Sequence, residues 1–179
     1  MKQPRSNEAL RTVVIGLGNT ILSDDGVGVY VARELRERLS RDSALESIDV
    51  IEAELAGLDM MEILSGYDRA VIVDSIELGG FEPGTVFRLS PDDFRTTPRL
   101  ASFHDIDLVT ALELGRRLDL EMPSEVVIYA VQAEDTLTLG EGCTPAVEAV
   151  RERLVNEIEQ YISGDIRNRV SIDLCFRKS

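Results

Sequence analysis

The chain has 179 residues, enough for one domain with a substantial core and too few for two domains of ordinary size. Its 33 acidic and 19 basic residues give a formal charge of −14, which disfavours nucleic acid and anionic membranes as partners because both would repel it. No apolar run approaches the roughly 20 residues of a membrane-spanning helix, and segment 1–11 lacks the hydrophobic stretch of a signal peptide, so we expect a cytoplasmic protein.

Segment 12–39, with the sequence TVVIGLGNTILSDDGVGVYVARELRERL, predicts a strand, a glycine-bearing loop and an amphipathic helix. The helix is indicated by apolar residues at helical spacing, namely Val27, Tyr30, Val31, Leu35 and Leu39. A glycine-rich turn after a first strand is also typical of a dinucleotide site. Here Ile21 replaces the third glycine of that motif, and two negative charges stand where phosphate would bind, so nucleotide binding is disfavoured.

Asp24 and Asp25 stand where this helix is expected to begin. One carboxylate could cap the helix, since it accepts unpaired backbone N–H groups and suits the positive end of the helix dipole. Two adjacent aspartates exceed what capping requires, so a functional carboxylate is equally open. Because adjacent helical side chains point about 100° apart, we expect Asp24 to be the cap and Asp25 to face the ligand crevice.

Strands and helices alternate along the rest of the chain. We expect strands at 48–53, 70–76, 86–89 and 126–131, and helices at 58–65, from His104 to Leu118, and at 145–162. The connection 77–85 is too short for a crossover helix, so the fourth strand should be antiparallel to the third. The long loop before His104 contains two prolines and little periodicity, and it should return the chain to the rim of the sheet where ligands bind.

These elements predict a three-layer α/β/α domain over residues 12–163, preceded by a polar lead-in at 1–11. The five-stranded, mostly parallel sheet should have the order 2-1-3-5-4, with strand 4 an antiparallel edge. The tail 164–179 is polar, but Val170, Ile172, Leu174 and Phe176 alternate, which leaves an added edge strand and a disordered end both open. Cys143 and Cys175 form no CxxC motif, and each is expected to be a buried or idle thiol.

Chain direction switches between strands 1 and 3 of this topology, and ligands bind in the crevice at such a point. Asp25 follows strand 1, Asp74 lies near the carboxyl end of strand 3, and His104 opens a helix on the same rim. Asp74 could equally be a carboxylate that bonds a loop backbone. Two carboxylates and an imidazole together suit a divalent ion such as zinc or nickel, held with open coordination positions.

The same residues carry a family resemblance. The motif GLGN at 16–19, SDDGVG at 23–28, VIVDSI at 71–76, FHDIDL at 103–108 and GEGCTPAVEAV at 140–150 resemble the nickel–iron hydrogenase maturation endopeptidases. The resemblance implies an enzyme that removes a C-terminal extension from the hydrogenase large-subunit precursor once nickel has been inserted. It also implies that Asp25, Asp74 and His104 are the catalytic and metal-contacting residues. Some family members have glutamate at the position of Asp25.

The resemblance further implies that nickel arrives with the precursor and that no organic cofactor is used. Nickel held by the three residues, or the residues themselves acting as general base, would activate water, as in an aspartic or metal-dependent endopeptidase. A serine or cysteine nucleophile is then unnecessary. Two alternatives stay open: a nickel-sensing or metal-carrying binding protein with the same residues and no hydrolysis, and a flavodoxin-like mononucleotide binder.

Overall fold

The computed structural model describes residues 10–42, 45, 47–54, 59–96 and 103–176, and the side chains of 94–96, 103–107 and 165–176 lie outside that description. The regular elements are β1 (Thr12–Leu17), the 3-10 turn η1 (Ser23–Gly26), α1 (Val27–Leu39), β2 (Ile48–Ala53), α2 (Asp59–Leu64), β3 (Arg69–Ile76), β4 (Val86–Leu89), α3 (Pro91–Thr96), α4 (Phe103–Arg117), β5 (Glu125–Gln132) and α5 (Pro145–Phe176). No helix among the described residues is long and apolar enough to cross a membrane.

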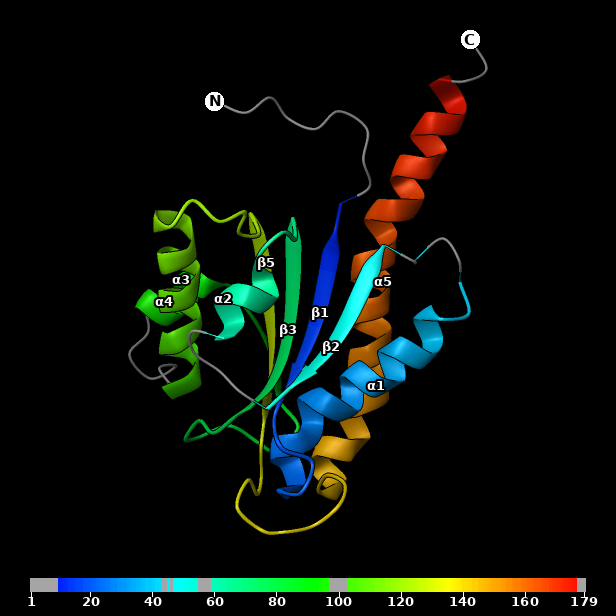
Figure 1. Cartoon of the computed structure of the whole chain (residues 1–179). Helices are drawn as coiled ribbons and strands as arrows, with labels where there is room; N and C mark the ends of the chain where they lie inside the picture. Colours follow the sequence, from blue (N-terminus) through cyan, green and yellow to red (C-terminus); the bar gives the residue numbers. More distant parts are fainter. Residues whose placement is uncertain (1–9, 43–44, 46, 55–58, 97–102, 177–179) are drawn as a thin grey trace.

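The five strands form one sheet in the order β2-β1-β3-β5-β4, and β4 is the antiparallel edge strand beside β5. This is the predicted order, and it follows from right-handed crossovers between the parallel strands. Residues 70–73 of β3 are fully or almost fully buried, as expected for a central strand covered on both faces. The carboxyl ends of β1, β3 and β5 therefore meet at one end of the sheet, at the bottom of Figure 1.

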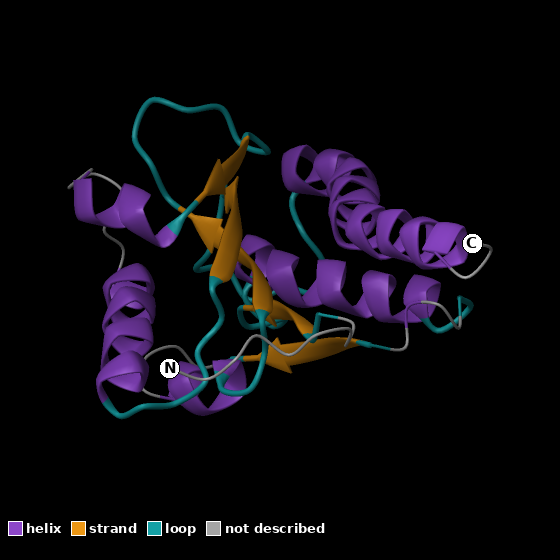
Figure 2. Cartoon of the chain, turned by 90° about the horizontal axis from the view of Figure 1, so that it is seen from above, coloured by secondary structure: helices purple, strands orange, loops and turns teal. Residues whose placement is uncertain are grey.

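Helices cover both faces of the sheet, which gives the predicted three layers (Figure 2). On one face, Val31 and Leu35 of α1 and Leu154 and Ile158 of α5 join a core cluster with the sheet. On the other face, Met60 of α2 and Leu112 of α4 belong to a second cluster. These four helices bury apolar side chains against the sheet.

The structure corrects two of the expectations. The segment before α4 is not an irregular loop throughout, because Pro91–Thr96 forms α3. Asp93 accepts hydrogen bonds from the backbone N–H and hydroxyl of Ser90, and Pro91 occupies the first helical turn, where its fixed φ favours a helix. The edge strand considered for the tail is also wrong, because α5 continues to Phe176. Gly164 lies within this helix, and a glycine there costs only about 1 kcal/mol of helix stability.

Candidate active site

Two glycines fold the first loop tightly against the carboxyl ends of β1 and β3. Gly18 has φ +127°, and a Cβ there would lie 1.7 Å from the carbonyl oxygen of Asp25. A Cβ at Gly28 would lie 2.2 Å from the carbonyl oxygen of Val73 and 2.3 Å from that of Leu17. Only glycine permits this approach, so the glycine spacing sets η1 directly against the carboxyl ends of β1 and β3.

Asp25 is half-buried at this end of the sheet. Its Oδ2 accepts a hydrogen bond from the backbone N–H of Asn19 at 2.8 Å, and its Oδ1 accepts a longer one, 3.4 Å, from the hydroxyl of Ser75. Asn19 is itself held in the loop, since its Oδ1 accepts from the backbone N–H of Ile21 at 3.1 Å. These donors fix the carboxylate in position while part of it remains exposed.

Asp74 lies near the carboxyl end of β3 and is paired with Ala130 of β5. Its Oδ1 accepts a hydrogen bond from the backbone N–H of Ser75 at 2.8 Å. Ser75 therefore contacts both carboxylates, one through its N–H and the other through its hydroxyl. The structure thus places Asp25 and Asp74 at the carboxyl ends of the neighbouring strands β1 and β3, and Ser75, which the sequence did not single out, is hydrogen-bonded to both.

His104 is the second residue of α4. The helix begins toward the carboxyl ends of the strands and runs back toward the start of β5, as the predicted topology requires (Figure 1). The imidazole itself lies outside the described side chains. No cluster of three histidine, cysteine, aspartate or glutamate residues occurs in the part of the chain whose side chains are described, so the three-residue metal site stays a prediction.

Asp24 has a different role from the predicted helix cap. It makes no capping hydrogen bond: the residues that precede η1 and α1 are Leu22 and Gly26, and neither has a side-chain cap. Instead the Asp24 side chain is fully buried and points to the loop after β5. The capping prediction failed because the acidic pair lies inside η1, ahead of α1, and Asp24 turns toward a neighbouring loop rather than toward the first helical N–H groups.

Four hydrogen bonds compensate the buried carboxylate of Asp24. Its Oδ2 accepts from the backbone N–H groups of Glu134 and Asp135, at 2.9 and 3.1 Å, and from the hydroxyl of Thr144 at 3.0 Å. Its Oδ1 accepts from the backbone N–H of Thr144 at 2.7 Å. A buried charge is tolerated only with such partners. Asp24 therefore ties both ends of the loop 133–144 to the turn that carries Asp25.

Further contacts hold the same two loops together. The backbone N–H of Gly140 donates to the carbonyl of Ile21 at 3.1 Å, and Leu22 pairs with Gly140 in an isolated parallel bridge. The hydroxyl of Tyr30 accepts from the N–H of Gly142 at 2.9 Å and donates to the carbonyl of Thr20 at 3.1 Å. The loops after β1 and β5 thus form one connected wall at the carboxyl end of the sheet.

Cys143 lies in this wall but is a poor nucleophile. Burial, reinforced by the negative charges of Asp24 and Glu148, raises the pKa of its thiol to about 12. Because the thiolate is the reactive form, Cys143 is almost entirely in its unreactive form at neutral pH. This agrees with the expected idle thiol; the side chain of Cys175, in α5, lies outside the described residues.

Three loops at this end of the sheet carry charge of one sign. The loops 18–26, 77–85 and 133–144 contain no lysine or arginine, and they carry the acidic residues Asp24, Asp25, Glu77, Glu82, Glu134, Asp135 and Glu141. A concentration of negative charge on one rim attracts cations and repels anions. It favours a metal cation or a basic partner and disfavours phosphate.

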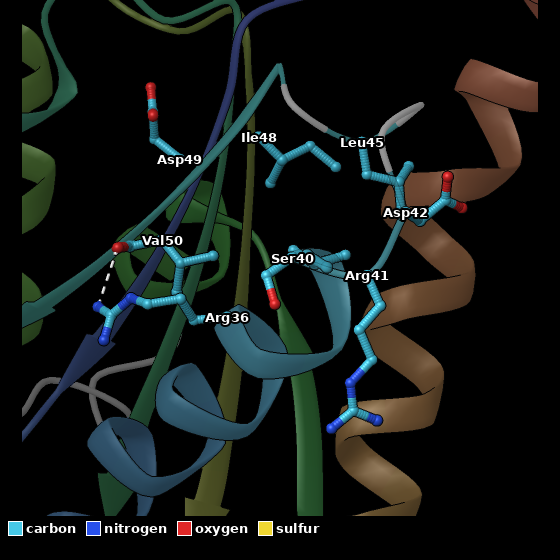
Figure 3. A pocket seen from close by; sticks show the side chains of 9 residues that line it. Arg36, Ser40, Arg41, Asp42, Leu45, Ile48, Asp49 and Val50 are labelled. Atoms are coloured by element: carbon cyan, nitrogen blue, oxygen red, sulfur yellow. Dashed lines mark hydrogen bonds between the residues drawn. The ribbon is translucent and has the colours of Figure 1, made fainter.

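A hollow of about 500 Å³ lies elsewhere, between the end of α1 and the start of β2 (Figure 3). It is lined by apolar residues such as Leu39, Leu45 and Ile48, together with Arg36 and Arg41. Arg36 donates to the carbonyl of Val50 at 3.0 Å. Since α1 ends and β2 begins at the amino end of the sheet, this hollow is remote from Asp25 and Asp74.

The fold is an open α/β sheet with carboxylates at the carboxyl ends of two neighbouring strands, and comparison with known proteins identifies its family. The family model of hydrogenase maturation proteases (HycI) matches residues 29–161. The chain therefore belongs to the hydrogenase maturation protease family.

Individual relatives agree with this assignment. The chain is 26% identical to the hydrogenase 2 maturation protease of Escherichia coli over 153 residues, which cover 83% of this chain and 88% of the relative. It is also 26% identical to the hydrogenase expression/formation protein HupD of Bradyrhizobium diazoefficiens, over 80% of this chain and 73% of that protein. The solved structure of the hydrogenase maturating endopeptidase HybD from Escherichia coli superposes with a TM-score of 0.71 at 24% identity, covering 87% and 94% of the two chains, and supports the same fold.

Proposed function

We propose that this protein is the endopeptidase that removes the C-terminal extension of a nickel–iron hydrogenase large-subunit precursor after nickel insertion. The observation that carries the proposal is the hydrogen bond between Asp25 and Ser75, the residue that follows Asp74, because it places two carboxylates at the carboxyl ends of the neighbouring strands β1 and β3. Family membership and the names of the relatives support hydrogenase precursors as the class of substrate.

Recognition would use the nickel that the precursor carries. Asp25, Asp74 and His104 supply two carboxylates and an imidazole, a donor set that suits borderline divalent ions. The two described donors to Asp25 leave lone pairs of its carboxylate for a metal. Nickel is then part of the substrate, and the negative rim around the crevice favours its approach.

Hydrolysis would follow from this positioning. The ion polarises the carbonyl of the scissile bond, and a carboxylate of the site accepts a proton from the attacking water. The water oxygen bonds to the carbonyl carbon, the C–N bond breaks, and the leaving nitrogen takes up a proton. Cys143 is not required, because its thiol remains protonated at neutral pH.

The direct test is incubation of the purified protein with a nickel-loaded precursor, followed by intact-mass measurement. We expect the precursor to lose the mass of its extension, and the same precursor without nickel to stay intact. A metal-carrying binding protein would bind the loaded precursor and leave its mass unchanged, which would overturn the proposal. Inhibitors of serine and cysteine proteases should leave cleavage unaffected.

A further inference from the structure

Large apolar side chains are exposed at the rim that carries Asp25 and Asp74. Among the described residues, Ile21 is 57%, Leu137 85% and Leu139 75% exposed, and they lie in the loops that follow β1 and β5. Leu118 and Leu120, 56% and 37% exposed, lie at the opposite end of the sheet, between α4 and β5. Single exposed leucines are ordinary, but several on one wall of an active-site crevice indicate a binding surface.

Ile21 and Leu139 are neighbours across the two loops. Leu22 and Gly140 pair in a parallel bridge, so the residues that precede them stand side by side on the other face of this short ladder. Leu137 is two residues further along the same loop. We call Ile21, Leu137 and Leu139 the apolar rim.

The apolar rim is held in its exposed position. Asp24 binds both ends of the 133–144 loop, and the carboxylate of Asp135 accepts from the backbone N–H groups of Leu137 and Thr138 at 3.0 and 2.9 Å. This loop is ordered, yet its leucines are not buried against its own domain. Burying them against another chain would therefore cost little conformational entropy.

We propose that the apolar rim binds the segment of the hydrogenase precursor next to the cleavage site, and that this segment carries large apolar and basic side chains. The inference rests on the proposed function. Its chemistry follows from the surface: leucine and isoleucine supply the apolar contact, and the surrounding loops contain acidic residues and no lysine or arginine. A basic segment complements that charge.

A second copy of the chain is a poor occupant for the same reason. It would bring a net charge of −14 and an identical acidic rim, and like charges facing each other oppose association. A nucleic acid or an anionic membrane would be repelled in the same way. By contrast, a precursor whose C-terminal region reaches Asp25 comes close to the apolar rim, because Ile21 and Asp25 belong to the same loop and that loop is bonded to Gly140.

The test compares two double variants in the cleavage assay with nickel-loaded precursor. Leu137→Ser/Leu139→Ser removes the leucines of the apolar rim, and Leu118→Ser/Leu120→Ser is the matched control at the far end of the sheet. We expect the rim variant to raise KM about tenfold or more, since truncated contacts at the centre of an interface commonly have effects of that size. Its kcat should stay within about twofold, because the contact is made equally before and during the reaction.

The control variant should keep both constants, and both variants should keep the melting temperature of the unchanged protein. A rim variant with unaltered KM, or a control with an equal rise, would overturn the proposal. If the unchanged protein binds the precursor without cleaving it, the proposed function fails while the docking inference is tested by the dissociation constants of the same variants. Absence of any binding overturns both.

The salt dependence of precursor binding tests whether the bound segment is basic. Surface charge pairs are screened over about 8 Å at physiological ionic strength, so affinity should fall as salt rises. An affinity that does not fall between low and high salt would overturn the basic part of the proposal. The rim variant should keep the same salt dependence, because its substitutions change no charge.

Discussion

The charged side chains at the two ends of the sheet have different kinds of partner. At the amino end, Arg69 is 2% exposed, and its guanidinium pairs with Glu125 at 3.1 Å and lies over the ring of Tyr161 at 5.2 Å. At the carboxyl end, Asp24 and Asp25 are held by N–H and O–H donors in loops without lysine or arginine. Neutral donors orient a carboxylate while leaving its charge uncancelled by a cation.

This difference indicates what each end is for. Charge that is neutralised locally stabilises the fold and offers nothing to a ligand. Charge that is oriented but not neutralised retains its field, and so it can attract a metal or a basic chain. The hollow of Figure 3 lies toward the amino end, and Arg36 and Arg41 are among its lining residues. Substitutions at the two ends should separate activity from stability.

The largest effect is expected at Asp25. Asp25→Asn keeps the size of the side chain and can still accept from Asn19, but a neutral amide is a poor metal ligand and no base. We expect cleavage of nickel-loaded precursor to fall by about a thousandfold or more, because ligand and base functions are both lost. The melting temperature should change little. A folded Asp25→Asn protein that still cleaves would remove the first loop from the mechanism.

Asp24→Asn, in contrast, should lower the free energy of unfolding. One amide oxygen can replace Oδ2 and keep three hydrogen bonds, but the amide NH2 then faces the N–H of Thr144, which lies 2.7 Å from Oδ1. Two opposed donors in a buried site should cost about 2–3 kcal/mol of unfolding free energy. Denaturant unfolding measures this.

Asp135→Asn is the matched control for Asp24→Asn. A single oxygen of Asp135 serves both of its described partners, Leu137 and Thr138, and the amide oxygen of asparagine can replace it. We therefore expect that variant to unfold within about 0.5 kcal/mol of the unchanged protein. Equal stability of Asp24→Asn and Asp135→Asn would contradict the role assigned to the buried carboxylate.

Asp24 also shows which contacts could not be predicted from the sequence. The strand order was accessible because alternating elements and right-handed crossovers leave few topologies. The placement of Asp25 and Asp74 at the carboxyl ends of two strands could be predicted because strand ends and loop acids follow one another in order along the chain. The partners of Asp24 were not, because Thr144 lies 120 residues away and no local pattern signals a bond of that span. An intervening 3-10 turn was enough to change the direction of the side chain.

Ser75 was missed for a related reason. Serine after a strand-end aspartate has no pattern of its own, and its contact with Asp25 spans 50 residues. The start of α3 at Ser90, in contrast, was available locally as serine, proline and an aspartate three residues after the serine. Local chemistry can be predicted from the order of residues, whereas contacts between distant loops depend on the completed sheet.

A substitution at the amino end should spare catalysis. Arg69→Met keeps most of the buried volume but removes the ion pair with Glu125 and the stacking on Tyr161. Since Glu125 is 47% exposed and water can solvate it, we expect a cost of about 1–2 kcal/mol rather than that of a fully buried pair. Denaturant unfolding should show this loss, while kcat and KM stay unchanged. A large fall in kcat would mean that the two ends are coupled.

Ser75→Ala should have a smaller effect. The hydroxyl donates to Asp25 over 3.4 Å, a long and weak bond, whereas the backbone N–H that serves Asp74 remains. We expect kcat to fall by about three- to tenfold, as for the loss of one weak orienting hydrogen bond. Complete loss of cleavage in the folded variant would instead identify Ser75 as a nucleophile and contradict a mechanism based on water.

The smallest effect is expected at Cys143. Burial raises the pKa of its thiol to about 12, so the thiol is neutral at every pH below that value and gains thiolate only as pH approaches it. Cys143→Ala should therefore leave cleavage within about twofold, because no step needs the thiolate. Iodoacetamide labelling at pH 8, followed by peptide mapping to separate Cys143 from Cys175, should show Cys143 reacting at least about tenfold more slowly than a free thiol of ordinary pKa. Fast labelling of Cys143, or loss of cleavage in the alanine variant, would place a reactive nucleophile at the carboxyl end of the sheet and overturn the contrast between its oriented carboxylates and its inert thiol.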